Sequence, residues 1–207
     1  MPVNRRYIKE LSDMFVDDLR RSDYYRQLTA PQRDDLEDRL TSEAEQGYYP
    51  LVPGAEDQDL ARLAVALVDE LDIRLPENLI NILRQVDGFV ANGVTMYGVD
   101  GDLRDDQFDA VPGLLAENSF HWASFPETIQ KYLFIGDADL WHFAIEVDAG
   151  TPVVLHKGTL TEAHRFSSLE ELVDDMLHQA LGYFEDKVDY IDNEPTDYPA
   201  GFQFSRS

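Results

Sequence analysis

The chain has 207 residues, with 41 Asp and Glu against 17 Lys and Arg, a formal net charge of −24 and no cysteine. This composition excludes disulfides and thiolate metal sites, and it disfavours binding to nucleic acid or anionic membranes, since both are bound mainly through Lys and Arg. A content of 43% hydrophobic residues still permits a buried core, and no apolar run is long enough to span a membrane, so we expect a folded cytoplasmic protein.

The first quarter of the chain has helical spacing of its apolar residues. These residues recur every three or four positions over 3–28, and Pro31 marks the first turn of a second helix that extends to about Ala44. Glycines and prolines between Gly47 and Gly54 then interrupt the pattern. We therefore expect a helical N-terminal arm over 1–54, ahead of the main domain.

Two more helices are predicted before the character of the sequence changes. Asp57 or Asp59 caps the first, whose apolar stripe reaches Leu71. The second begins at Pro76 and ends at Asp87-Gly88, with proline in its first turn and glycine just past its end.

From Phe89 onward the sequence favours strands and then one long helix. The strand candidates are 94–98, 131–135, 140–147, 151–156 and 162–166. The turns between the middle candidates have hairpin length, so neighbouring strands must be antiparallel. Ser167 and Ser168 cap a final helix with a broad apolar face. The sequence thus predicts an α+β fold, with an antiparallel sheet of about five or six strands flanked by helices over 55–188, an N-terminal helical extension and an acidic tail over 189–207.

No familiar catalytic motif is present. The chain has no phosphate-binding glycine loop, no His-Glu-x-x-His and no Gly-x-Ser-x-Gly. His142 and His156 lie on adjacent strand candidates and could face each other, but the spacing supplies no third metal ligand. We expect no catalytic residue, no metal and no cofactor. A hydrolase with paired carboxylates stays open as an alternative, because 41 acidic residues select no particular pair.

Acidic clusters are the candidate partner-binding residues, and a solvated surface is the alternative interpretation of each. The densest loop resembles a calcium loop, but Arg104 stands at the third ligand position and no glycine follows at the sixth. A basic protein partner would relieve the self-repulsion of such clusters. The candidates are Asp100, Asp102, Asp105, Asp106 and Asp109 in this loop, Asp137 and Asp139 in a turn, and Glu171, Asp174 and Asp175 on the last helix.

Four segments resemble the SMI1/KNR4 (SUKH) superfamily. The stretch 75–88 resembles its Leu-Pro helix that ends in an Asp-Gly turn, and 89–98 resembles the following strand in the form of the YrhA-like bacterial subgroup. The stretch 134–141 resembles the family's Ile-Gly-Asp segment, and 165–172 its closing Phe-x-Ser helix start, with Leu169 in place of the aromatic residue.

This resemblance implies an α+β domain with an antiparallel sheet. It also implies a non-catalytic immunity protein, a monomer or weak homodimer that binds and neutralises a basic, nuclease-type toxin domain. A regulatory or scaffold interaction protein, as in the family's fungal members, is the alternative.

Overall fold

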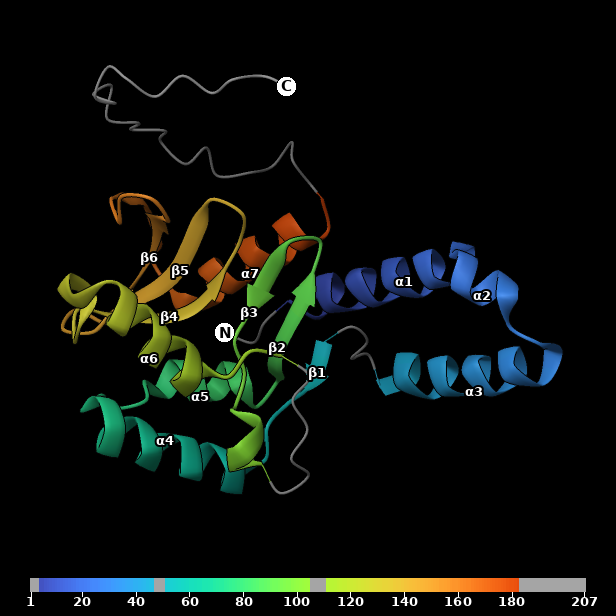
Figure 1. Cartoon of the computed structure of the whole chain (residues 1–207), viewed down its shortest axis with the longest axis horizontal. Helices are drawn as coiled ribbons and strands as arrows, with labels where there is room; N and C mark the ends of the chain where they lie inside the picture. Colours follow the sequence, from blue (N-terminus) through green and yellow to red (C-terminus); the bar gives the residue numbers. More distant parts are fainter. Residues whose placement is uncertain (1–3, 47–50, 105–110, 183–207) are drawn as a thin grey trace, which may run out of the picture.

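A computed structural model describes residues 4–46, 51–104 and 111–182 (Figure 1). These residues form seven α-helices, two short 3-10 helices and one sheet of seven antiparallel strands, which lie in the sheet in the same order as in the chain. The predicted α+β class and antiparallel sheet are therefore confirmed, with more strands than the five or six expected.

The helices are α1 Arg5–Arg21, α2 Asp23–Gln27, α3 Ala30–Gln46, α4 Asp57–Leu71, α5 Glu77–Leu83, α6 Leu114–Ser124 and α7 Leu169–Ala180, with 3-10 turns η1 Gly101–Leu103 and η2 Pro126–Thr128. The strands are β1 Leu51–Pro53, β2 Val86–Ala91, β3 Val94–Met96, β4 Tyr132–Asp137, β5 Trp141–Glu146, β6 Thr151–His156 and β7 Glu162–Arg165.

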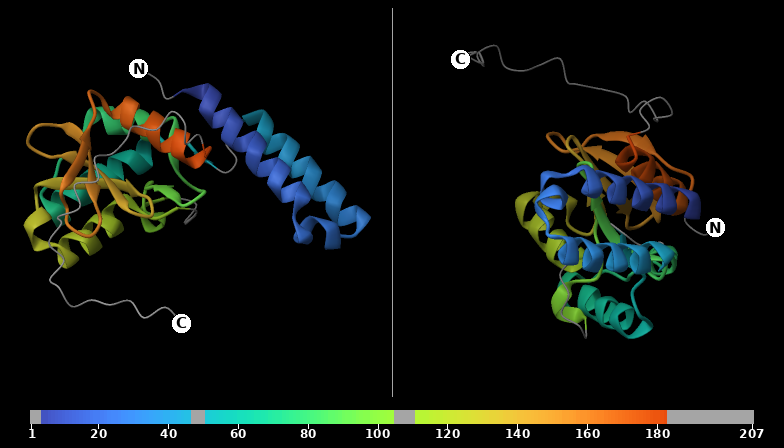
Figure 2. Two further views of the ribbon diagram at one scale, coloured as in Figure 1. Left: turned by 90° about the horizontal axis from the view of Figure 1, so that it is seen from above. Right: turned by 90° about the vertical axis from the view of Figure 1, so that its right-hand side faces the viewer.

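The N-terminal arm is a helical hairpin that projects from the domain (Figures 1 and 2). The single helix expected over 3–28 is interrupted at Ser22, whose hydroxyl accepts a hydrogen bond from the Tyr25 N–H and caps α2. Val16, Leu36 and Leu40 form a small apolar cluster between α1 and α3, separate from the main core. The outer part of the arm therefore has a small core of its own.

The base of the arm is packed on the main domain. Ile8 and Leu11 of α1 belong to the main core. The Asn4 N–H donates to Asp174 Oδ1 of α7 at 3.1 Å. The segment 51–53, which we expected to belong to the arm, is strand β1 and pairs with β2. The sheet thus begins before the boundary that we predicted at residue 54.

The helix that we expected to end at Asp87-Gly88 is shorter. Helix α5 ends at Leu83, and 86–88 instead open strand β2. Gly88 has a φ of +87°, a backbone conformation that glycine adopts without strain. Phe89 is fully buried and pairs with Met96 of β3. Burial and strand pairing therefore override the local helical pattern here.

Helices cover both sides of the sheet. Helix α7 and helix α6 lie on opposite sides of β4 and β5 in two perpendicular views (Figures 1 and 2). The middle residues of β4, β5 and β6 are buried without the alternation of a half-exposed sheet. Ser168 caps α7 as predicted, accepting the Glu171 N–H. Among the described residues, no helix combines the length and apolar character that a membrane span requires.

Helix α6, which we did not predict, completes the edge of β4. Strand β3 is only three residues long, so part of β4 has no strand beside it. The side chain of Asn118 supplies the missing partner, because its amide donates to the Phe134 carbonyl at 2.8 Å and its carbonyl accepts the Phe134 N–H at 2.8 Å. The Trp122 indole donates to the Tyr132 carbonyl at 3.0 Å. Two polar side chains of α6 thus replace a strand at this edge.

Candidate functional site

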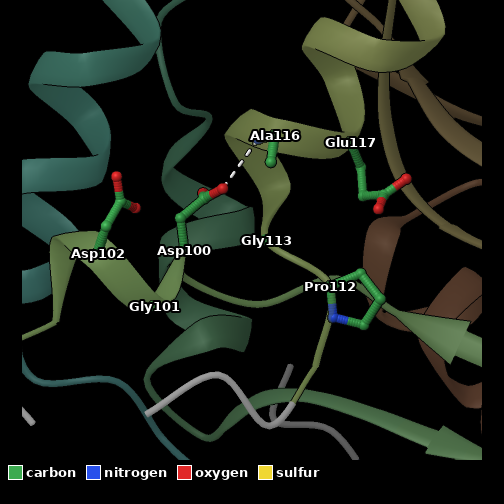
Figure 3. Close-up of a pocket in the computed structure, with 7 residues that line it drawn as sticks. All are labelled: Asp100, Gly101, Asp102, Pro112, Gly113, Ala116 and Glu117. Atoms are coloured by element: carbon green, nitrogen blue, oxygen red, sulfur yellow. Dashed lines mark hydrogen bonds between the residues drawn. The ribbon is translucent and has the colours of Figure 1, made fainter. Parts of the chain in front are cut away.

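A pocket of about 680 Å³ lies between η1 and the N-terminus of α6 (Figure 3). It is lined by Asp100, Gly101, Asp102, Pro112, Gly113, Ala116 and Glu117. Three of these residues are acidic, and the described residues that line the pocket include no basic side chain. We take this pocket as the candidate site because it brings two of the predicted acidic residues together with a third that we did not predict.

Asp100 has a structural role in the pocket wall. Its two carboxylate oxygens accept the N–H groups of Leu115 and Ala116, each at 2.8 Å, so it caps α6 from a distant loop (Figure 3). Gly113 permits this approach, because a Cβ atom there would collide with the carboxylate. Burial raises the pKa of Asp100, while the two N–H donors oppose the shift. As a buried cap, Asp100 is not free to bind a partner.

The Asp100→Ala variant is expected to lose about 2 kcal/mol of unfolding free energy, because one buried and one partly buried N–H group at the start of α6 lose their acceptor. Asp102→Ala is the matched control, since Asp102 is exposed in the same turn and should change stability by less than about 0.5 kcal/mol. Urea denaturation of both variants measures the difference. Equal stability of the two variants would contradict the capping role.

The loop that carries η1 is held by a buried ion pair. Asp87 of β2 is fully buried, accepts the Val99 N–H at 2.8 Å and pairs with the Arg104 guanidinium. Burial raises the pKa of Asp87 to about 6, against the opposing effects of these two partners. Arg104, which we noted only as an obstacle to calcium binding, therefore anchors the loop to the sheet.

Asp102 and Glu117 are the carboxylates that remain available in the pocket. Asp102 is exposed, and the side chain of Glu117 is one-third exposed. Figure 3 shows them on either side of Asp100, one from η1 and one from α6. Burial, and then the nearby charges of Asp137 and Asp100, raise the pKa of Glu117. A cation at this position would relieve the repulsion among the carboxylates.

A buried polar network extends from Glu117 into the domain. Glu117 Oε2 lies 4.0 Å from Nε2 of His121, which lies 3.1 Å from the Tyr97 hydroxyl. The Tyr97 hydroxyl donates to Asp137 at 2.8 Å, and Lys157 Nζ lies 2.9 Å from the other oxygen of Asp137. Because the single hydroxyl proton is donated to Asp137, the Tyr97 oxygen must accept the hydrogen bond from the Nε2–H group of His121. Neutral His121 therefore carries its hydrogen on Nε2.

His142 lies against His121 at the end of this network. The ring centroids are 4.7 Å apart, and the Nδ1 atoms of both rings are buried without a hydrogen-bond partner in the structure. Burial lowers the pKa of both rings, that of His142 to about 4. Our expectation that His142 and His156 could face each other is wrong, because His142 pairs with Leu155 and its neighbour Trp141 pairs with His156. Adjacent residues of a strand point to opposite faces.

The other acidic candidates are dispersed. Asp137 belongs to the network just described, while Asp139 is exposed in the turn after β4 and lines a different pocket. Glu171 is exposed on α7 and accepts hydrogen bonds from Ser167. Asp174 accepts the Asn4 N–H, and Asp175 is buried beside Gln179. The acidic residues of α7 thus do not form one free surface. Asp105, Asp106 and Asp109 lie outside the described residues, as does the tail over 189–207.

The fold and the site together describe an α+β protein with an acidic pocket beside a buried pair of histidines. Within the described ranges, no group of three or more His, Asp or Glu side chains is arranged to hold a metal ion. The chain matches no family model and no curated protein.

Sequence reasoning missed Glu117, His121 and Lys157. The first two stand four residues apart, a spacing that places them on one face of a helix. Gly113 before an apolar pair is a weak helix-start signal that could have located α6. No sequence signal connects Lys157 of the segment after β6 with Asp137, because their contact depends on the register of three strands.

Proposed function

We propose that this protein is a non-catalytic binding protein of the SMI1/KNR4 type, an immunity protein that neutralises a basic, nuclease-type toxin domain by stoichiometric binding. The observation that supports it best is the pocket of Figure 3, where Asp102 and Glu117 are accessible and no basic side chain lines the described wall. The net charge of −24 places this pocket in a strongly negative field.

The physical basis of the proposal is complementarity with a phosphate-binding surface. A nuclease presents Lys and Arg to nucleic acid, so a surface of carboxylates can occupy the same groups. The long-range field of the acidic chain increases the association rate, and added salt reduces that effect. One toxin domain held in this way is unable to bind its substrate.

The buried network supports a structural role over a catalytic one. Tyr97 and His121 are buried, and Asp137 is engaged by both Tyr97 and Lys157. A general acid or base has to reach a bound substrate within hydrogen-bond distance. The hydrogen bonds of Tyr97 instead connect α6 with β4 and with the segment after β3, which positions the wall of the pocket.

The test is affinity capture with the tagged full-length chain from its own cell, followed by mass spectrometry at low and high salt. We expect one basic, toxin-like domain in 1:1 ratio, with weaker recovery at high salt. The double variant Asp102→Asn/Glu117→Gln should weaken its binding about tenfold, since interfacial charges act on association. The control variant Glu127→Gln/Asp148→Asn also removes two negative charges, at two exposed positions that do not line the pocket.

Two outcomes contradict this proposal. If the captured proteins include no basic toxin-like domain, the proposed partner is wrong. Equal weakening by the pocket variant and the control variant shows that net charge alone, without the pocket, determines binding.

A regulatory or scaffold protein is the second candidate, and the projecting arm is the observation that favours it (Figure 1). Tyr24 is 59% exposed near the tip of the arm. If the scaffold role holds, Tyr24→Ser should abolish capture of intracellular partners, while the pocket variant leaves capture unchanged.

A further inference from the structure

An apolar groove of about 540 Å³ runs along the outer face of α4. It is lined by Gln58, Ala61, Arg62, Val65, Ala66, Asp69 and Glu70 of α4 and by Leu103 of η1. Val65 is 60% exposed, and Val68, one turn further along the helix, is 44% exposed. Val65 lines the groove and Val68 is exposed one turn further along the same helix, so together they form an apolar strip at and beside the groove.

The core does not use this strip. The opposite face of α4 buries Leu60, Leu63 and Leu67 in the main core. The guanidinium of Arg62, which lines the groove, donates to Asp59 and to the Leu103 carbonyl at 3.0 Å, so it connects η1 to α4. The groove is therefore a fixed feature of the fold, built by a helix and by a turn that it holds in place.

The groove and the acidic pocket adjoin each other across η1. Leu103 lines the groove, and the preceding residue, Asp102, lines the pocket. Figure 3 shows η1 between α4 and the first turn of α6, and η1 contacts α4. The apolar strip thus adjoins the acidic pocket on the side of Asp102, and Glu117 lies across the pocket, beyond Asp100.

Charges around the groove select the occupant. Asp69 and Glu70 are exposed at one end, and Asp102 is exposed at the side. Arg62 is the one basic residue that lines the groove within the described chain, and its guanidinium is engaged by Asp59 and Leu103. An acidic segment would be repelled, and so would a second copy of this chain, with its net charge of −24. A cationic segment with an apolar face meets both requirements of this surface.

We propose that α4, η1 and the start of α6 form one docking surface for a basic amphipathic helix of a protein partner. Apolar side chains of that helix lie on Ala61, Val65 and Leu103, and a Lys or Arg enters the pocket between Asp102 and Glu117. This inference rests on the proposed function, because it assigns to the basic partner a particular surface and a particular mode of binding.

The probe is a synthetic helix of about 18 residues built from Leu and Lys with apolar positions at helical spacing. Fluorescence anisotropy with the full chain at physiological salt measures its affinity, and amide chemical shifts map its position. We expect shifts on α4, η1 and the first turn of α6. The variant Val65→Ser/Val68→Ser should weaken binding about tenfold, since it removes apolar contact area.

Val90→Ser is the matched control, because Val90 is 49% exposed on β2, away from the lining of the groove. It should leave the affinity unchanged. A second probe, in which Ser replaces every Leu, should lose most of the affinity although its charge is the same. Thermal melts check that both protein variants are folded. We expect little loss of stability, because all three substitutions are at exposed positions.

Several results would overturn the docking surface. Shifts confined to α7 or α1, equal affinities of wild type and Val65→Ser/Val68→Ser, or equal binding of the Leu and Ser probes each exclude the groove. None of these results affects capture of a basic toxin domain, so the proposed function would survive them. A different result is also informative. If no basic toxin domain is captured but the Leu-Lys helix binds at the groove, the immunity role is wrong and the groove remains a site for basic helices.

Discussion

Replacing Asn118 by alanine is expected to lower the free energy of unfolding by about 3 kcal/mol. Asn118 is fully buried and makes hydrogen bonds to both the N–H and the carbonyl of Phe134. Alanine leaves these two groups of β4 buried without a partner, and each costs about 1–3 kcal/mol. Alanine's better helix propensity offsets only about 0.6 kcal/mol. Urea denaturation followed by circular dichroism measures the loss.

Asn81→Ala is the control for this prediction. Asn81 is exposed on α5, and its side chain accepts one weak hydrogen bond from Arg84 at 3.3 Å. The same substitution there should change stability by less than about 0.5 kcal/mol. If Asn118→Ala were equally mild, the edge of β4 would not depend on the amide. Amide hydrogen exchange offers a second measurement, since the Phe134 N–H should lose protection in Asn118→Ala alone.

Acidification from pH 7 to about pH 4 is expected to cost the folded protein about 3 kcal/mol through His142. The pKa of His142 is lowered from its ordinary 6.5 to about 4, mainly by burial and then by the neighbouring His121 and Lys157, while Asp137 opposes the shift. Between these two values the unfolded chain binds a proton that the folded chain does not. The contribution of His142 to stability is therefore full above pH 6.5 and is lost as pH falls towards 4.

The variant His142→Phe isolates this contribution. Phenylalanine suits a site formed by the rings of Phe134, Phe125 and His121, and it does not titrate. Its stability relative to wild type should therefore rise by about 3 kcal/mol between pH 7 and pH 4. Asp87 acts in the opposite direction, because its pKa is raised to about 6, but it contributes equally to both proteins and cancels in the difference. A difference that is constant with pH would contradict the prediction.

Strands β4 to β7 and helix α7 were predictable because each has a local signal. Hairpin-length turns separate the strands, and Ser168 precedes a helix whose apolar residues repeat at helical spacing. Strand β2 was not predictable in this way, since 86–88 continue a helical pattern and become a strand only through pairing with β3. Helix α6 escaped detection because polar Asn118 and His121 stand on its buried face. They hide the apolar periodicity that marks most helices.

The site was only partly predictable, for a related reason. Composition indicated acidic surfaces, and Asp102 is indeed exposed in the pocket. The sequence does not distinguish an accessible carboxylate from a buried one such as Asp100 or Asp175. Glu117 reaches the pocket because of the packing of α6 on β4, which depends on contacts between distant segments. Charge patterns therefore predicted Asp102 of this pocket but not Glu117.

The order of the strands has a consequence for how the chain folds. Every strand pairs with its neighbour in sequence, so the sheet can grow from β1 to β7 as the chain leaves the ribosome. The β1–β2 and β3–β4 connections are long because they contain helices α4, α5 and α6. The two ends are the exception, since the Asn4 N–H bonds to Asp174 and the Tyr7 ring meets His178, both on α7. The base of the arm can therefore complete its docking only after α7, the last described helix, has been synthesised.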